Sequence, residues 1–431
     1  AAARGEGRIW LVTEGAQAVD STVSLSAALQ SPLWGWGRGF ALEHPARWGG
    51  LVDLAAGADP QHAADTLLAA IDADDGEDQT AWRGGQRRVA RLVKAAPPSA
   101  APASFKPDGC YLVTGGFGGL GLVVARWMAE RGARHIALLG RHADAAAEGV
   151  RAIEALGAKV HVLQGDVADE TTMTRLLAQL RADAPPLRGV MHAAAALSAA
   201  PLAELSRSQI AEMMAPKLAG TLVLERLTRG DGLDFMVLFS STTALLGASG
   251  LAHYAAANGF LDAFAQALNP ARRMLSVNWG TWEVMRLASA DDRRSYRESG
   301  LQPVAQADAL DALGRLLAGT QAQAVVAKVD WSVLKPLHEA RRARPFLARV
   351  GTAVRPAQPA SRTEAGPSLA ERLAALPAAM RRDLLVEFVQ QEAAAVLGLG
   401  SGDAVPVATG LFDLGMDSLM AVELKRRLER G

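Results

Sequence analysis

A glycine-rich turn between an apolar strand and an amphipathic helix constrains this sequence more than any other feature. Residues 110–114 (CYLVT) read as a short strand, and a helix continues from Leu122. Glycines in such a turn let backbone N–H groups approach a pyrophosphate at the helix N-terminus. The pattern predicts an α/β fold with a Rossmann-like, doubly wound parallel sheet. The expected cofactor contacts in the turn TGGFGGLG are Gly115, Phe117, Gly118, Gly119, Leu120 and Gly121.

The next three strand-like segments add candidate cofactor contacts. HIALLGR ends in Arg141, where an NAD site usually has an acidic residue, so a 2′-phosphate contact and NADPH are favoured; a solvated arginine is the alternative. KVHVLQGDVAD places Asp166 and Val167 near an adenine ring, although Asp166 can equally cap the next helix. LRGVMHAAAALS runs into small residues, including Ala193, that let the backbone lie along ribose and nicotinamide. His192 in this segment favours a structural role.

The stretch from 234 to 258 carries residues suited to carbonyl reduction. The apolar run FMVLF predicts a buried parallel strand, and Ser241 follows at its functional end. Tyr254 and Asn258 are four residues apart, so they share one face of the next helix. Tyr254 and Ser241 hydroxyls can donate to an alkoxide that forms when a carbonyl accepts hydride. Lys217 is the candidate that lowers the tyrosine pKa, although alone it also fits a surface lysine.

Length and composition exclude several classes of protein. A chain of 431 residues is long enough for two to three domains. Lys plus Arg and Asp plus Glu are 45 each, so no net field recruits nucleic acid or an anionic membrane. One cysteine, Cys110, fits a reducing cytosol, and no apolar run is long enough to span a bilayer. A cytoplasmic protein without a bound metal is expected.

Composition shifts divide the chain into four parts. Residues 1–105 combine strand and helix patterns without a phosphate loop, and the glycine-turn unit spans 106–349. Residues 350–367 are rich in Ala, Pro, Ser and Gly, which predicts a flexible tether. Helical periodicity resumes in 368–431.

Residues 109 to about 335 resemble the catalytic half of a polyketide synthase ketoreductase (KR), within the short-chain dehydrogenase/reductase superfamily. The resemblance rests on TGGFGGLG, APK around Lys217, FSS at 239–241, YAAAN at 254–258 and SVNWGTW at 276–282. Ser241 precedes Tyr254 by 13 residues, as in that family. The family also exchanges the usual lysine and asparagine positions, as this chain does. The resemblance implies that Tyr254 donates the proton, Ser241 holds the substrate oxygen, Lys217 tunes the tyrosine and Asn258 supports the lysine or a relay water.

The first 95 residues resemble the structural half of the same domain, a degenerate Rossmann-like companion without a cofactor site. The family usually has further strands before RIWLVT, so we expect this half to be truncated. The family's stereochemical markers are missing, because Leu197, Ser198 and Ala199 replace Leu-Asp-Asp, and Leu246 stands where the opposite class has tryptophan. The missing acidic motif weakly favours that second class.

The segment LGMDSLMAVEL, residues 414–424, resembles the attachment motif of an acyl carrier protein (ACP). The resemblance implies that Ser418 carries 4′-phosphopantetheine, installed by a phosphopantetheinyl transferase; a simple helix cap is the alternative. Because the sequence stops soon after this helix, we expect a partial α-helical carrier domain.

These parts together predict NADPH-dependent reduction of an ACP-tethered β-ketoacyl thioester to a β-hydroxyacyl thioester within a multifunctional polyketide synthase. The expected partners are the ACP-bound polyketide intermediate and other synthase domains: ketosynthase and acyltransferase, with dehydratase, enoylreductase or methyltransferase as further candidates. No nucleic acid or membrane is expected. A fatty-acid-synthase ketoreductase, a free-standing short-chain dehydrogenase and a non-reducing or epimerising scaffold stay open as alternatives.

Overall fold

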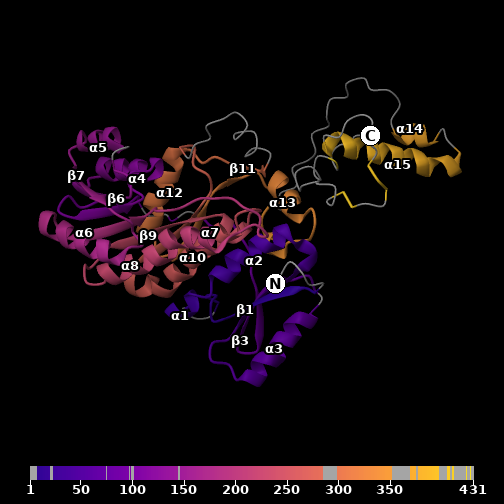
Figure 1. The fold of residues 1–431 in the computed structure, drawn as a ribbon, viewed down its shortest axis with the longest axis horizontal. Helices are drawn as coiled ribbons and strands as arrows, with labels where there is room; N and C mark the ends of the chain where they lie inside the picture. Colours follow the sequence, from indigo (N-terminus) through magenta and orange to yellow (C-terminus); the bar gives the residue numbers. More distant parts are fainter. Residues whose placement is uncertain are drawn as a thin grey trace.

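The structure, a computed structural model, shows two α/β units followed by a helical C-terminal region (Figure 1). The residues that it describes are 7–19, 23–73, 75–96, 98, 101–143, 146–284, 299–351, 369–374, 377–397, 405–407, 410–411, 424 and 428.

A seven-stranded parallel sheet forms the centre of the larger unit, as the sequence predicts. Its spatial order is β12-β10-β9-β8-β5-β6-β7, so the chain reverses direction across the sheet between β5 and β8. Ligands bind beyond the carboxyl ends of the strands at such a reversal point. The strands are β5 (Cys110–Thr114), β6 (His135–Gly140), β7 (Lys159–Gln164), β8 (Leu187–His192), β9 (Phe235–Ser241), β10 (Met274–Trp279) and β12 (Gln323–Val326).

Helices cover both faces of this sheet and bury one apolar core on each side (Figure 1). One face carries α4 (Gly119–Glu130), α5 (Ala147–Glu154) and α12 (Gln306–Ala318). The other face carries α6 (Glu170–Asp183), α8 (Gly220–Thr228) and α10 (Ala252–Arg272). Because both faces are covered, the central strands are almost continuously apolar and buried.

The smaller, N-terminal unit has a four-stranded sheet in the order β1-β2-β3-β4. The first three strands are parallel and β4 is antiparallel. The sheet confirms the strand predicted in RIWLVT. Its elements are β1 (Ile9–Glu14), α1 (Leu25–Ala28), α2 (Pro32–Glu43), η1 (Pro45–Arg47), β2 (Trp48–Leu54), α3 (Pro60–Asp72), β3 (Gln79–Arg83) and β4 (Gln86–Val89).

Helix α2 joins the two units by packing closely on α10. An added Cβ at Gly35 would lie 2.1 Å from the carbonyl oxygen of Ala255, and one at Gly39 would lie 2.6 Å from the Cβ of Ala252. Both glycines therefore allow the two helix backbones to touch. Because Tyr254 lies on the first turn of α10, the N-terminal unit sets the position of a predicted catalytic residue.

We expect Gly35→Ala to destabilise the protein by about 1–3 kcal/mol, because the new methyl group overpacks a backbone contact that cannot yield. The control is Gly37→Ala, whose added Cβ would meet the ends of side chains and no backbone atom: those of Leu51 and Trp48 at 2.9 Å and that of Leu11 at 3.0 Å. Chemical denaturation of both variants measures the difference. Equal stability of Gly35→Ala and the wild type would contradict the close packing.

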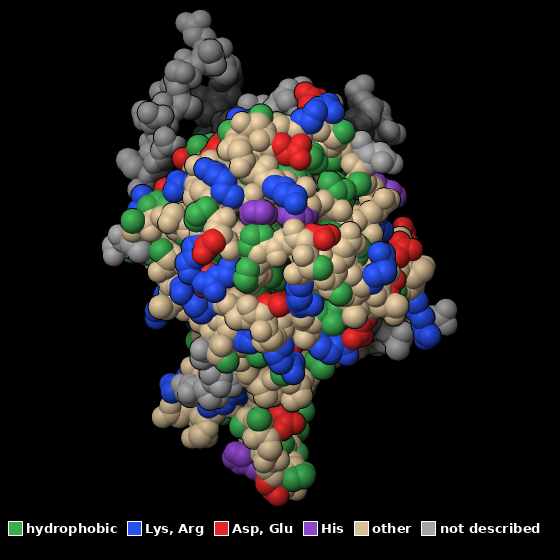
Figure 2. Space-filling model, turned by 90° about the vertical axis from the view of Figure 1, so that its left-hand side faces the viewer, with side chains coloured by type: hydrophobic (Ala, Val, Ile, Leu, Met, Phe, Trp, Pro, Cys, Tyr) green, Lys and Arg blue, Asp and Glu red, His purple; other side chains and the backbone are tan. Residues whose placement is uncertain are grey.

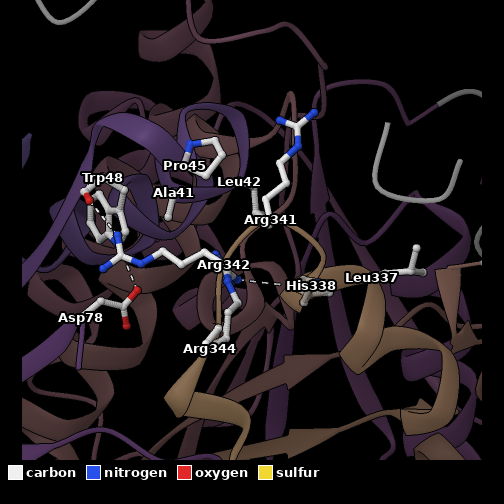
Figure 3. Close-up of a pocket in the computed structure, with 11 residues that line it drawn as sticks. Ala41, Leu42, Pro45, Trp48, Asp78, Leu337, His338, Arg341, Arg342 and Arg344 are labelled. Carbon is white, nitrogen blue, oxygen red and sulfur yellow. Dashed lines mark hydrogen bonds between the residues drawn. The ribbon is translucent and has the colours of Figure 1, made fainter. Parts of the chain in front are cut away.

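A small pocket lies where the C-terminal part of the larger unit meets the end of α2 (Figure 3). Arg342 donates to the carbonyl oxygen of Trp48 at 2.7 Å, and Arg344 donates to that of Leu246 at 2.9 Å. Arg344 also lies 3.3 Å from His338 Nδ1, and burial and this arginine lower the His338 pKa to about 3. These guanidinium groups hold backbone carbonyls, so the pocket is a junction between segments.

The described part of the chain contains further helices and strands. They are α7 (Arg207–Met214), η3 (Ala215–Ala219), α9 (Thr243–Leu246), β11 (Leu301–Gln302), β13 (Lys328–Val329), α13 (Trp331–Glu339), η4 (Pro345–Leu347), α14 (Leu369–Ala374) and α15 (Ala378–Leu397).

The predicted tether lies almost wholly outside the described residues, and Ser418 lies outside them. Where the structure describes the chain, no helix has the length and apolarity needed to cross a membrane. Figure 2 shows side chains of both charges spread over the face at the β7 edge.

Candidate active site

The glycine turn lies at the carboxyl end of β5, next to the end of β8. Gly115 has φ +67°, and a Cβ there would lie 2.9 Å from the carbonyl oxygen of Ala193. At Gly121 a Cβ would come within 2.3 Å of the Gly115 carbonyl oxygen, so the turn packs tightly against its own helix. Added Cβ atoms at Gly118 and Gly119 would meet nothing closer than 3.3 Å and 3.9 Å. The N-terminus of α4 is therefore uncovered on that side, which fits a dinucleotide pyrophosphate.

The other predicted contacts around the turn lie at the tips of neighbouring strands. The Phe117 ring lies over Gly140 at the end of β6, where an added Cβ would be 2.7 Å from the ring. Arg141 follows directly and is exposed. Leu120 is partly buried against the core on the α4 face of the sheet.

The segment after β7 corrects one alternative from the sequence. Asp166 is exposed and its carboxylate accepts from Ala168 N at 2.9 Å, which forms a turn. The cap of α6 is Asp169, whose carboxylate accepts from the backbone three residues on, so the reading of Asp166 as the cap is wrong. Val167 is buried and faces Gly220 of α8. Its backbone, more than its side chain, is therefore placed to meet a ligand.

A π-helical turn, η3, places Lys217 between α7 and α8. Pro216 has no backbone N–H to donate to a regular helix, and such widened turns occur often at functional sites. His192 holds the turn, because its Nε2 is 3.0 Å from the Pro216 carbonyl oxygen and its Nδ1 is 2.7 Å from Thr114 Oγ1. Burial and the charge of Lys217 lower the His192 pKa to about 3, so the ring is neutral. The structural role favoured for His192 fits this position.

Lys217 is buried, so the surface-lysine alternative is wrong. Its Nζ donates to the carbonyl oxygen of Phe239 at 2.7 Å and lies 5.7 Å from the centre of the Tyr254 ring. Burial lowers the Lys217 pKa to about 7, and the negative charge of Asp262 opposes that shift. A buried cation thus lies beside the phenol whose ionisation it would favour.

Ser241 and Asn258 lie on the two elements that bracket this pair. Ser241 ends β9, and its hydroxyl oxygen accepts from Thr243 N at 3.2 Å. Ser240 Oγ donates to the Asn258 carbonyl oxygen at 3.2 Å, which holds the end of β9 against α10. The Asn258 amide donates to the Tyr254 carbonyl oxygen at 2.8 Å, whereas its buried Oδ1 has no partner among the described residues. The four predicted catalytic residues therefore surround one end of β9.

A buried acid behind this group was not predicted. Asp262 accepts from Ser276 Oγ at 2.6 Å and from Asn278 Nδ2 at 2.8 Å. Burial raises its pKa to about 6, and the hydrogen bonds oppose the shift. Asp262 lies four residues beyond Asn258 on α10, so helical spacing was a signal that could have found it.

Arg38 of α2 is a second buried charge that the sequence did not reveal. Its Nη1 donates to the Ala244 carbonyl oxygen in α9 at 2.6 Å. Burial lowers its pKa to about 10, and Asp262 opposes the shift. The N-terminal unit thus contributes a cation to the segment that follows Ser241.

We expect Asp262→Asn to shift the pH dependence of kcat for the predicted carbonyl reduction. The pH at which kcat falls on the alkaline side should become lower. The Asp262 charge raises the Lys217 pKa, so its removal lets the ammonium lose its proton at lower pH. Asp311→Asn is the control, because it removes the same charge from α12, where Asp311 pairs with Arg315 at a partly exposed position. An unmoved limb in Asp262→Asn, measured over pH 5.5–9.5, would contradict this coupling.

The fold and the grouping at the end of β9 define an oxidoreductase of the Rossmann type. Residues 109–284 match the family model described as KR domain, residues 1–92 match "Polyketide synthase extender module SpnB, Rossmann fold domain", and residues 387–431 match "Phosphopantetheine attachment site". The chain belongs to the ketoreductases of modular polyketide synthases. A phosphopantetheine attachment region follows the ketoreductase part of the chain. This family implies NADPH for the Rossmann unit and 4′-phosphopantetheine for the C-terminal region.

Solved structures and curated proteins agree with this assignment. A structure described as "Structure of A-type Ketoreductases from Modular Polyketide Synthase" is 38% identical, with a TM-score of 0.73 over 80% of this chain and 73% of that one. "PlmKR1-Ketoreductase from the first module of phoslactomycin biosynthesis in Streptomyces sp. HK803" is also 38% identical, with a TM-score of 0.73 over 79% of this chain and 80% of that one.

The curated relatives are far longer than this chain. "Erythronolide synthase EryA3" of Saccharopolyspora erythraea is 38% identical over 99% of this chain, which spans 13% of that protein. "Polyketide synthase GfsA" of Streptomyces halstedii is 38% identical over 97% of this chain, which spans 6% of that protein. The relatives are therefore multidomain synthases, of which this chain matches one part.

Proposed function

We propose that this chain reduces a β-ketoacyl thioester, held on a carrier domain, to a β-hydroxyacyl thioester with NADPH. The observation that carries the proposal is the buried Lys217 ammonium 5.7 Å from the Tyr254 ring at the carboxyl edge of the sheet. When bound, the dinucleotide supplies hydride to the carbonyl carbon. A non-reducing or scaffolding domain would not require this arrangement.

Each residue of the group has a distinct task in this proposal. Tyr254 O–H protonates the alkoxide oxygen, and Ser241 O–H donates a hydrogen bond to the same oxygen. The ammonium of Lys217 lowers the pKa of the phenol because a nearby positive charge favours phenolate. The buried Oδ1 of Asn258 would accept a hydrogen bond from a relay water or from the lysine.

The cofactor contacts form a second set around the glycine turn. Gly115, Gly118, Gly119 and Gly121 would cradle the pyrophosphate. The exposed Arg141 would pair with the 2′-phosphate and so select NADPH. The remaining proposed contacts are Phe117, Leu120, Asp166, Val167 and Ala193.

The C-terminal region would deliver the substrate. Ser418, within the matched attachment region, is the proposed site of phosphopantetheine. We further propose the domain limits 1–105, 106–349, 350–367 and 368–431. The proposed partners are a phosphopantetheinyl transferase and the other domains of the parent synthase. The cytoplasmic location stays a prediction.

NADPH oxidation with an N-acetylcysteamine 3-oxoacyl thioester tests the reductase. Reduction of the thioester with NADPH, and far slower reduction with NADH, is expected; no turnover of either would overturn the proposal. Arg141→Ala is expected to raise KM for NADPH without a similar change for NADH.

Intact mass after incubation with coenzyme A and a phosphopantetheinyl transferase tests the attachment site. The wild-type chain should gain one phosphopantetheine, and Ser418→Ala should gain none. Equal labelling of the two proteins would place the attachment elsewhere.

A further inference from the structure

Two loops frame the carboxyl edge of the sheet beside Tyr254. One follows β8 and includes residues 193–206, and the other, residues 247–251, precedes α10. Ala200 N donates to the Gly250 carbonyl oxygen at 2.9 Å, and Ser198 Oγ lies 3.4 Å from His253 Nε2. The two loops are therefore in direct contact beside the first turn of α10, which carries Tyr254.

The carboxylate of Glu43 joins these loops from outside the reductase unit. Its Oε2 accepts from Leu202 N at 2.7 Å, and its Oε1 accepts from Gly250 N at 2.8 Å. Each loop thus gives one backbone N–H to one oxygen of the same carboxylate. Glu43 is the last residue of α2, and it lies 159 residues before Leu202 and 207 residues before Gly250.

The surroundings of Glu43 make this link strong and rigid. Hydrogen bonds from N–H groups to a carboxylate are roughly twice as strong as neutral ones. Glu43 is partly buried, which limits competition from water. The position of helix α2 relative to α10 is fixed, because Gly35 and Gly39 bring the two helix backbones into contact. The carboxylate is thus fixed relative to Tyr254, and both loops are fixed to it.

The same loops hold the positions at which the sequence lacks the family's stereochemical markers. Leu197, Ser198 and Ala199 lie in the first loop, and Leu246 lies directly before the second. Leu197 is 71% exposed, so its side chain is free to contact a ligand. The spacing of the two loops therefore bears on how an acyl chain can lie against them.

We propose that Glu43 is a positioning residue that sets which face of the substrate carbonyl is reduced, by fixing the distance between the 193–206 and 247–251 loops. The inference rests on the proposed reductase function. Loss of the carboxylate would release two backbone N–H groups. The loops would then be held by their own weaker contacts, such as the Ala200 N–H bond to the Gly250 carbonyl oxygen, and their spacing would vary. The acyl chain could then enter in either direction, and the hydride would reach both carbonyl faces.

The test compares Glu43→Ala and Glu43→Gln with the wild-type chain on a racemic 2-methyl-3-oxoacyl thioester of N-acetylcysteamine. Chiral chromatography measures the ratio of hydroxy products, and kcat and KM are measured separately. We expect Glu43→Ala to lower the ratio of major to minor product about tenfold or more, with kcat retained within about tenfold. Glu43→Gln should be intermediate, because an amide accepts one N–H but directs its NH₂ at the other.

Hydrogen–deuterium exchange supplies a readout that does not need turnover. Peptides covering residues 196–204 and 247–253 should exchange about tenfold faster in Glu43→Ala, as loss of a charge-assisted hydrogen bond predicts. Glu14→Gln is the matched control, because Glu14 also accepts from a backbone N–H, that of Gly57, within the N-terminal unit. The control should change neither the product ratio nor the exchange of these loops.

The outcomes separate this inference from the proposed function. Unchanged loop exchange in both Glu43 variants would overturn the positioning role. This result does not depend on turnover, so it can be read even if the wild type reduces no thioester and the proposed function fails. Faster exchange with an unchanged product ratio would overturn the role in selectivity. If Glu43→Ala unfolds, Glu43→Gln decides by the same two criteria.

Discussion

Tyr254→Phe is expected to lower kcat for the β-ketoacyl thioester by about 10²–10⁴-fold, the range that a positioned general acid contributes. The substitution removes the hydroxyl that would protonate the alkoxide and keeps the ring. The ring contributes to packing near Lys217, whose Nζ is 5.7 Å from its centre. NADPH affinity should therefore change little, because the glycine turn and Arg141 follow other strands, β5 and β6.

Steady-state NADPH oxidation and fluorescence titration of NADPH measure these two quantities. Tyr111→Phe is the matched control: Tyr111 lies in β5, and its hydroxyl accepts from Lys106 N at 2.7 Å, at the opposite end of the strand from the glycine turn. The control should lose some stability but keep its kcat. A Tyr254→Phe enzyme with wild-type kcat would show that another group protonates the product.

Local patterns were enough to predict the reductase unit. The strand CYLVT, the glycines after it and the apolar run FMVLF each encode one element, and parallel strands place their carboxyl ends at one edge. The spacing of Tyr254 and Asn258 likewise follows from helix geometry alone. Tyr254 and Ser241 could thus be proposed from local patterns, whereas the role of Asn258, and the choice of Lys217 over a surface lysine, came from the resemblance to the ketoreductase family.

The charges around that group could not be predicted, because they depend on contacts between distant segments. Glu43 and Arg38 belong to α2, and nothing in the local sequence of this helix indicates a partner for either charge. The contacts of Arg38 with Ala244 and of Glu43 with Gly250 span about 200 residues. The π-helical turn at Lys217 also escaped prediction, because His192 stabilises it from another strand. Only Asp262 had a local signal, one helical turn beyond Asn258.

Lys217→Met is expected to lower kcat by about 10- to 10³-fold without lowering stability. An opposite charge nearby shifts a pKa by about 1–3 units, so its loss would weaken Tyr254 as an acid at neutral pH by a similar number of decades. Methionine keeps much of the volume of the aliphatic stem. It also removes the desolvation cost of an ammonium that is only 2% exposed, which offsets the lost hydrogen bond to Phe239.

The pair of measurements, kcat and the midpoint of thermal unfolding, distinguishes a catalytic from a structural lysine. Lys335→Met is the control, because Lys335 also donates to a backbone carbonyl, that of Val350, at 3.4 Å, but lies in α13 outside the site. It should leave kcat unchanged. Because burial lowers the Lys217 pKa to about 7, the wild-type kcat should fall above that pH as the ammonium is lost, and Lys217→Met should lack this limb. A variant that loses stability in proportion to its activity would instead make Lys217 a structural residue.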